Sequence, residues 1–141
     1  MLSNTHFSMA VHVLSALAYR DGDVVGSEDL AQTVGTNPSF LRGLIGQLKE
    51  AGLVETHLGK GGGTMLARSA SKITLRDVYG ATESQPALKT HECDGKSPCP
   101  VARGMDRMLT EVNDRMQKVL ESELKRMTVA GLVASHIDRP A

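Results

Sequence analysis

The sequence predicts a mainly α-helical fold with one small β-hairpin and a long helix near the C-terminus. Two observations support this fold class. Apolar residues recur at three- and four-residue spacing through several segments, which is typical of amphipathic helices. One short stretch of alternating residues is interrupted by a run of glycines and then resumes, which is typical of a hairpin.

Length and composition narrow the possibilities. The 141 residues, 40% of them hydrophobic, are enough for a compact core. Sixteen Lys and Arg balance sixteen Asp and Glu, and this zero net charge argues against indiscriminate coating of nucleic acid or anionic membrane. No signal-peptide pattern opens the chain, and no apolar run approaches the roughly 18 residues that span a bilayer. We therefore expect a cytoplasmic protein with no membrane partner.

The first two helices are recognised by their ends. Ser3 or Asn4 is expected to cap a helix that runs to Tyr19, because a short polar side chain accepts hydrogen bonds from first-turn amides. A second, short helix begins with Ser27 as its cap and stops at Gly35, which suits a left-handed turn.

The third helix leads directly into the hairpin. Asn37 is its expected cap, and Pro38 takes the first helical position, where a missing N–H has no cost. An Ala-Gly pair at 51–52 ends the helix. Residues 53–58 and 64–67 form two strands, joined by a glycine-rich tip.

The C-terminal half contains a short helix, a loop and a long helix. Thr74 caps the short helix, which runs through Ala81, and residues 82–100 form a polar loop with both cysteines. The long helix is expected from Val101 to about Met127, at a length of about 40 Å. Its apolar stripe is longer than the rest of the domain can cover. The simplest partner is a second copy of the chain, which predicts a homodimer.

The segment that joins the second and third helices has a specific spacing. Ala31 lies where the two helices would touch, and Gly35 follows four residues later. Apolar residues on both sides complete a small core: Leu30, Val34, Leu41 and Leu44. This pattern is typical of a DNA-binding helix-turn-helix, and the hairpin that follows, with Lys60 at its tip, is its wing. The predicted fold is thus a winged helix-turn-helix with a long C-terminal dimerisation helix.

The outer face of the third helix carries the candidate contacts to double-stranded DNA. Arg42 suits a two-pronged contact to guanine, and Gln47 suits adenine. Gly43 and Gly46 cost about 1 kcal/mol each relative to Ala, which makes sense where the backbone approaches a ligand closely. The complete predicted set is Ser27, Pro38, Ser39, Phe40, Arg42, Gln47, Lys60, Gly61, Gly62 and Arg68.

Local charge agrees with this interpretation. Residues 38–72 carry five basic and two acidic side chains, a net charge of +3 in a chain that is neutral overall. A modest basic patch is consistent with a sequence-specific regulator. The alternative of another class is a helical adaptor that binds protein through the third helix, without DNA. No nucleophile, acid–base pair or phosphate-binding loop has a suitable setting, so we do not expect an enzyme.

Beyond these inferences, the sequence resembles the Rrf-two (IscR/NsrR-type) family of bacterial winged-helix transcription regulators. The resemblance covers nearly the whole chain, through the stretches FSMAVHVLSALA, LAQTVGTNPSFLRGLIGQLKEAGLVET, GKGGGTMLAR, ITLRDVYGATE and HECDGKSPCPVARGM. It implies a homodimer whose recognition helices enter successive major grooves of an operator. It also implies that Ser39, Phe40 and Arg42 lie near bases or phosphates, and that Lys60 with Gly61–Gly63 forms the wing tip.

Several members of that family hold an iron–sulphur cluster through three cysteines of this loop. Cys93 and Cys99 match the first two, but Met105 and Asp106 stand where the third is expected. Two thiolates are an incomplete set, so we expect no cofactor. Three interpretations of the pair stay open: a cluster completed by His91, Asp106 or the other subunit's His12; a redox-switch disulfide; and two unremarkable thiols.

We divide the chain accordingly. Residues 1–82 are the predicted DNA-binding domain, 83–100 the cysteine-containing loop, and 101–141 the dimerisation helix and its tail. Lys96 and Arg103 near the cysteines are expected to favour the thiolate form modestly.

Overall fold

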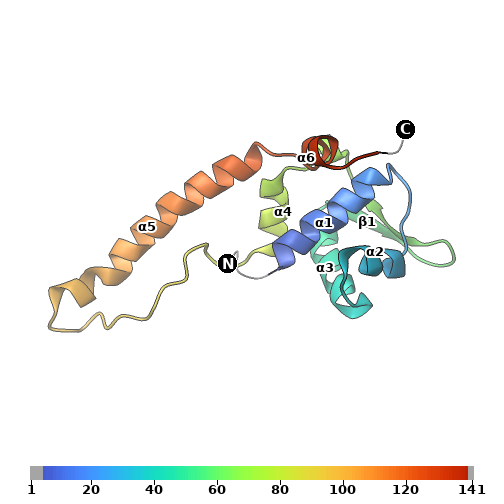
Figure 1. Ribbon diagram of the computed structural model, residues 1–141. Helices are drawn as coiled ribbons and strands as arrows, with labels where there is room; N and C mark the ends of the chain where they lie inside the picture. The colour runs from blue at the N-terminus through green and yellow to red at the C-terminus, as the bar shows by residue number, and fades with distance from the viewer. Residues whose placement is uncertain (1–4, 140–141) are drawn as a thin grey trace.

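Helix α1 (His6–Tyr19) forms the centre of the helical body in the computed structural model, which describes residues 5–139 (Figure 1). Its buried side chains are Ala10, Val13, Leu14 and Leu17. The expected caps Ser3 and Asn4 lie outside the described residues. The residue before the helix is Thr5, whose side chain makes no capping hydrogen bond.

Helices α2 (Ser27–Val34) and α3 (Pro38–Glu50) lie beside α1 and contact each other. The predicted end of α2 is confirmed, because Gly35 adopts a left-handed conformation with φ of +79°. The predicted cap of α2 is wrong. Gly26 takes the cap position and Ser27 is the first helical residue, with no side-chain capping bond.

The hairpin follows α3 as predicted. Strands β1 (Val54–His57) and β2 (Gly63–Leu66) pair antiparallel, with Val54 opposite Leu66. The backbone of Val25, before α2, adds an isolated bridge to Thr64, so strand β2 is bonded to the segment that leads into the helix-turn-helix.

A 3₁₀ turn, η1 (Ala70–Lys72), connects β2 to α4 (Leu75–Thr82). The predicted cap of α4 is confirmed. Thr74 accepts a hydrogen bond from the Asp77 N–H, and the Asp77 carboxylate accepts one from the Thr74 N–H, at 3.1 and 3.0 Å. These reciprocal bonds satisfy two amides that the helix leaves unpaired.

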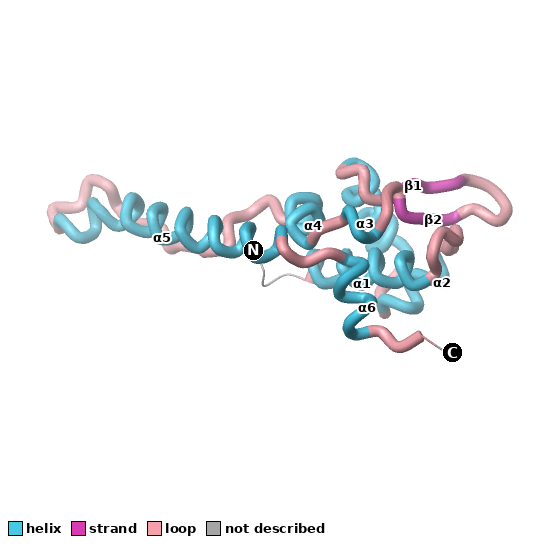
Figure 2. Tube along the Cα trace, turned by 90° about the horizontal axis from the view of Figure 1, so that it is seen from above, coloured by secondary structure: helices cyan, strands magenta, loops and turns pink. Residues whose placement is uncertain are grey.

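Helix α5 (Pro100–Lys125) projects from the body, and the cysteine-containing loop runs beside it in both views (Figures 1 and 2). Side chains of α5 hold the loop. Asn113 accepts a hydrogen bond from the Leu88 N–H at 3.1 Å, and Gln117 accepts one from the Ala87 N–H at 3.3 Å. The predicted long helix is thus confirmed, and it is 26 residues long.

A further helix, α6 (Val129–His136), occupies the segment that we predicted as a tail. Thr128 caps it, accepting a bond from the Gly131 N–H. Val129 and Val133 are buried in the core that α1 organises. The helix has only eight residues, so its apolar positions form a weak periodic pattern. None of the helices that the structure describes is long and apolar enough to cross a membrane.

Candidate nucleic-acid interface

The turn between α2 and α3 fixes the angle at which α3 leaves the body. The N–H groups of Gly35 and Thr36 both donate to the Ala31 carbonyl, at 2.9 and 3.0 Å. A left-handed residue is needed at Gly35, and glycine adopts that conformation without steric cost. The expected small core is present, with Leu30, Ala31, Leu41 and Leu44 buried and Val34 half-buried.

The start of α3 is fixed by its cap. Asn37 Oδ1 accepts a hydrogen bond from the Phe40 N–H at 2.8 Å, and Pro38 takes the first helical position as predicted. Pro38 and Ser39 are both exposed here. Of the other first-turn amides, Pro38 has no N–H and the Leu41 N–H donates to the Asn37 carbonyl at 3.1 Å, which leaves the Ser39 N–H. An N–H at a helix N-terminus favours an anion such as a phosphate.

Helix α3 presents an exposed face opposite its buried one. Leu41, Leu44, Ile45 and Leu48 face the core. The exposed face consists of Ser39, Arg42, Gly43, Gly46, Gln47, Lys49 and Glu50. The first five are the outward residues that the sequence predicts. Only Gly43 and Gly46 lie between Arg42 and Gln47 on this face, so a ligand can approach the backbone there.

The hairpin tip is a tight turn. The Gly62 N–H donates to the Gly59 carbonyl at 2.9 Å, which leaves Lys60 and Gly61 exposed at the end of the wing. Gly62 cannot carry a side chain, because a Cβ there would overlap the His57 carbonyl oxygen. Its role in the structure is therefore to close the turn beneath the exposed tip.

A groove of about 450 Å³ lies between α3 and the hairpin. Arg42 and Lys49 line it from α3, and His57 and Leu58 line it from the hairpin. Lys49 Nζ donates to Thr56 Oγ1 at 3.2 Å, which bridges the two elements. Within the described chain neither Arg42 nor Lys60 forms an ion pair, whereas Arg20 is paired with Asp29 at 3.0 Å.

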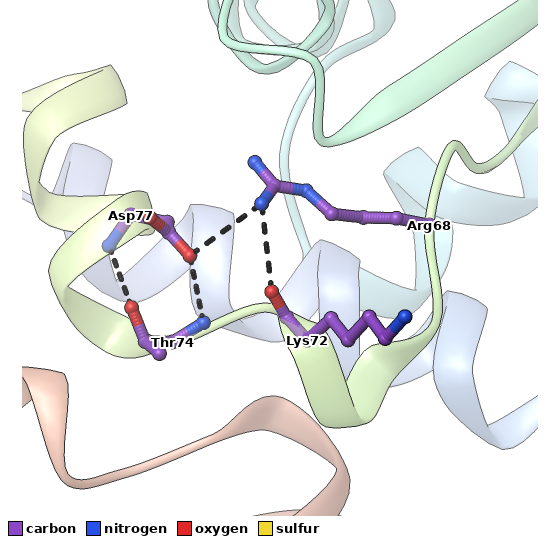
Figure 3. Close-up of polar contacts among 4 residues, drawn as sticks. All are labelled: Arg68, Lys72, Thr74 and Asp77. Carbon is purple, nitrogen blue, oxygen red and sulfur yellow. Dashed lines mark hydrogen bonds and ion pairs between the residues drawn. The ribbon is translucent and has the colours of Figure 1, made fainter.

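Three residues of the predicted set have contacts inside the protein. Phe40 is half-buried, packs against the core and meets the His6 ring edge-on at 5.1 Å. Ser27 is half-buried and lines the groove at the start of α2. Arg68 lies behind the wing, where its guanidinium donates to the Lys72 carbonyl at 3.5 Å and lies 3.9 Å from the Asp77 carboxylate (Figure 3).

The two cysteines differ in their surroundings. Cys93 is half-buried, and its Sγ lies 3.2 Å from His91 Nε2. Partial burial, and then the charge and hydrogen bond of the Asp106 carboxylate, raise the pKa of the Cys93 thiol. Asp106 thus lies close to Cys93. A cluster that used both residues as ligands would require them to be close.

Cys99 is exposed and occupies the cap position of α5. The backbone N–H groups of Ala102 and Val101 lower the pKa of its thiol, because they donate hydrogen bonds to the thiolate. Lys96 and Arg103, which we expected to favour the thiolate, are not among the causes of this shift. Arg103 instead donates to the carbonyls of Ser97 and Pro98, both at 3.2 Å.

The donor set for a metal or cluster is incomplete within the part of one chain that the structure describes. No group of three or more His, Cys, Asp or Glu side chains in residues 5–139 is arranged to hold a metal ion. His12 is exposed on α1, where it lines a cavity of about 440 Å³ together with Tyr19 and Leu30. The described residues of one chain therefore do not fit an iron–sulphur cluster by themselves.

Comparison with known proteins places this arrangement in a family. Residues 3–135 match the model of the Rrf2 family, described as an iron-dependent transcriptional regulator. The chain belongs to the Rrf2 family. This confirms the resemblance seen in the sequence and the winged helix-turn-helix fold.

Three relatives of this Rrf2-family chain are informative. It is 31% identical to the HTH-type transcriptional regulator IscR of Yersinia enterocolitica over 134 residues, which cover 94% of this chain and 78% of IscR. It is 30% identical to the HTH-type transcriptional repressor NsrR of Streptomyces coelicolor over 129 residues, which cover 90% and 84%. The solved structure of CymR, the global cysteine regulator of B. subtilis, superposes with a TM-score of 0.67 at 23% identity, covering 96% and 97%.

The protein is therefore a DNA-binding transcription regulator, and the comparisons do not favour the protein-binding adaptor. Its relatives are named for regulation rather than catalysis. Lys49 and Leu58 also line the groove, although neither is in the predicted set. Lys49 lies seven residues after Arg42, two helical turns along the same face, and this spacing was the available signal. Leu58 is apolar, so nothing in the sequence indicated that it belongs to a DNA-binding site.

Proposed function

We propose that this Rrf2-family protein binds a pseudo-palindromic operator as a homodimer, with α3 in the major groove and the wing against the adjacent backbone. The observation that carries the proposal is the exposed face of α3 beside the hairpin tip. Arg42 and Lys60 are exposed there and unpaired within the described residues. Cations without an internal partner are available to a polyanion.

The two cations have different proposed roles. Arg42 extends from the middle of α3 and reads a guanine, since a guanidinium matches the two acceptors of that base. Gln47 is exposed on the same helix and reads a neighbouring base. Lys60 on the wing and the exposed first turn of α3, with Pro38 and Ser39, bind phosphates, which position the protein without reading sequence.

The other predicted contacts have supporting roles. Gly61 is exposed at the wing tip, where it allows the backbone to approach the duplex, and Gly62 closes the turn beneath it. Ser27 borders the groove at the start of α2. Phe40 supports α3 from its inner side, where it packs on His6. Arg68 holds the wing against the cap of α4, and it would reach a phosphate only by giving up Asp77 (Figure 3).

The second copy covers α5. Five large apolar side chains of this helix are exposed, all within one stripe: Val101, Met108, Val112, Met116 and Val119. Leu124 is the only fully buried residue that the structure describes in α5. An uncovered stripe of this length is unfavourable in water, and an identical helix is complementary to it. The exposed stripe supports a dimerising role for α5 within segment 101–141, whereas α6 packs on the DNA-binding body. Segments 1–82 and 83–100 are proposed as the DNA-binding and sensing parts.

Selection from a random duplex library tests this proposal. The full-length protein is expected to enrich a pseudo-palindrome whose half-sites are separated by one helical turn or a multiple of it. Enrichment that depends on salt but not on sequence would contradict sequence-specific binding. Enrichment of a single half-site would contradict the dimer.

For the loop we propose a response to thiol oxidation rather than a cluster. This is supported by the two free thiols and by the incomplete donor set within one chain. The second candidate is an iron–sulphur cluster, which the family description and the approach of His91 and Asp106 to Cys93 favour. Its remaining ligands, such as His12, would have to come from the other subunit.

A visible absorption spectrum after anaerobic purification separates the two candidates. The thiol proposal predicts a colourless protein whose Cys93 and Cys99 change in mass on oxidation. Visible absorbance that disappears in Cys93→Ala would establish the cluster and overturn our preference.

A further inference from the structure

The hairpin tip carries a leucine that is almost fully exposed to solvent. Leu58 is 97% exposed, the largest exposed fraction of any large hydrophobic side chain in the described chain. The next most exposed ones, Val119 and Val101, lie in the α5 stripe, which the proposed dimer covers. A single exposed leucine is common on protein surfaces, so its position must carry the argument.

Leu58 lies where the hairpin turns. It follows β1 directly and precedes the turn that the Gly62 N–H closes on Gly59. It lines the groove that also contains Arg42 and Lys49, and Lys60 is two residues away. An apolar side chain thus lies on the groove that Arg42 and Lys49 also line, on the surface proposed to face DNA.

The positions of the cations on this surface indicate which part of the DNA Leu58 would contact. Arg42 on α3 and Lys60 on the wing attract the phosphates that border a groove, and Leu58, exposed on the same surface, can then contact that groove. With α3 in the major groove, the groove beneath the wing is the minor one. Proteins that bind the minor groove frequently insert leucine there.

We propose that Leu58 is a minor-groove contact that makes this protein select A·T over G·C base pairs beneath the wing. The inference rests on the proposed function and adds a specificity-determining residue to it. In the minor groove a G·C pair differs from an A·T pair by the guanine N2 amino group. Leucine has no acceptor for that donor. Covering the amino group would leave it without a hydrogen bond, which is unfavourable.

Base analogues test this contact without altering the major groove. The probe is the duplex that the full-length protein enriches from the random library, in two versions. One carries 2,6-diaminopurine for adenine at the positions beneath the wing, which adds the N2 amino group; the other is unmodified. The wild-type protein is expected to bind the modified duplex about fivefold or more weakly, as for a mismatched base pair. Leu58→Ala is expected to bind both equally.

Lys60→Ala is the matched control on the same wing. It should weaken binding to both duplexes and reduce the salt slope by about one, because one phosphate contact is lost. It should keep the preference for adenine. Leu58→Ala should leave the salt slope unchanged. Its urea unfolding midpoint should also match wild type, because the side chain is almost fully exposed.

The outcomes distinguish a wrong role for Leu58 from a wrong proposal of operator binding. Equal binding of both duplexes by the wild type, or an unchanged preference in Leu58→Ala, would overturn the role of Leu58 and leave operator binding intact. Failure of the wild type to enrich any sequence would overturn both.

Discussion

The side-chain amide of Gln117 in α5 donates a hydrogen bond to the hydroxyl of Tyr79 in α4, with 2.9 Å between Nε2 and the phenol oxygen. Gln117 also accepts a hydrogen bond from the Ala87 N–H in the cysteine-containing loop. Tyr79 is buried, and its ring meets Phe7 of α1 edge-on at 6.1 Å. One side chain of the projecting helix therefore connects the loop to the body that holds α3.

This connection predicts a measurable coupling between the two residues. A double-mutant cycle with Tyr79→Phe and Gln117→Ala should give an interaction energy of about 0.5–1.5 kcal/mol in urea unfolding, the usual net value of such a bond. Tyr79→Phe removes only the hydroxyl and keeps the ring contact with Phe7, so it serves as the conservative arm. Additive effects of the two substitutions would show that the bond contributes nothing.

The cap of α3 makes a prediction about stability. Asn37→Ala should lower the free energy of unfolding by about 0.5–2 kcal/mol, because the Phe40 N–H loses its acceptor. Asn37→Asp keeps an acceptor at the same place and should remain close to wild type. Equal losses in both variants, measured by urea denaturation, would contradict the capping role.

The pKa shifts of the two thiols predict an order of reactivity. The pKa of Cys99 is lowered and that of Cys93 is raised, so near neutral pH a larger fraction of Cys99 is thiolate, the reactive form. Iodoacetamide should therefore alkylate Cys99 first, as followed by peptide mass spectrometry.

The difference in alkylation rate between Cys99 and Cys93 should narrow as the pH rises through the raised pKa of Cys93, because both thiols are then ionised. It should also vanish in urea, where both lose their surroundings. Faster modification of Cys93 in the folded protein would contradict the assignment.

The stripe on α5 predicts a change in oligomeric state. Met116→Glu places a charge within the exposed apolar stripe and should convert the dimer to monomers of 15.1 kDa, as measured by light scattering during gel filtration. Thr110→Glu adds the same charge at an exposed position on another face of α5 and should stay dimeric. A wild-type monomer, or a dimer in both variants, would contradict the interface.

Local signals in the sequence determined most of the fold. The cap at Asn37, the capping residue Thr74 and the left-handed Gly35 each depend on neighbouring residues, so their outcomes could be predicted. Ser27 was misjudged because Gly26, a residue without a side chain, takes the cap position.

What could not be predicted depends on distant contacts. The bond between Gln117 and Tyr79 joins residues 38 positions apart. Arg68 looked like a free cation in the sequence, and only the fold brings Asp77 to it. Likewise, Leu58 resembles any other apolar residue of a strand until its exposure is known.

Arg42→Ala and Lys60→Ala can be compared directly on the selected operator and its single-base variants, across a range of salt concentrations. Arg42→Ala should lose about 1–3 kcal/mol at one base pair of each half-site and no longer discriminate there. Lys60→Ala should weaken binding to all variants alike, with a salt slope smaller by about one. The same uniform loss in both substitutions would show that α3 does not read the sequence while the wing holds the backbone.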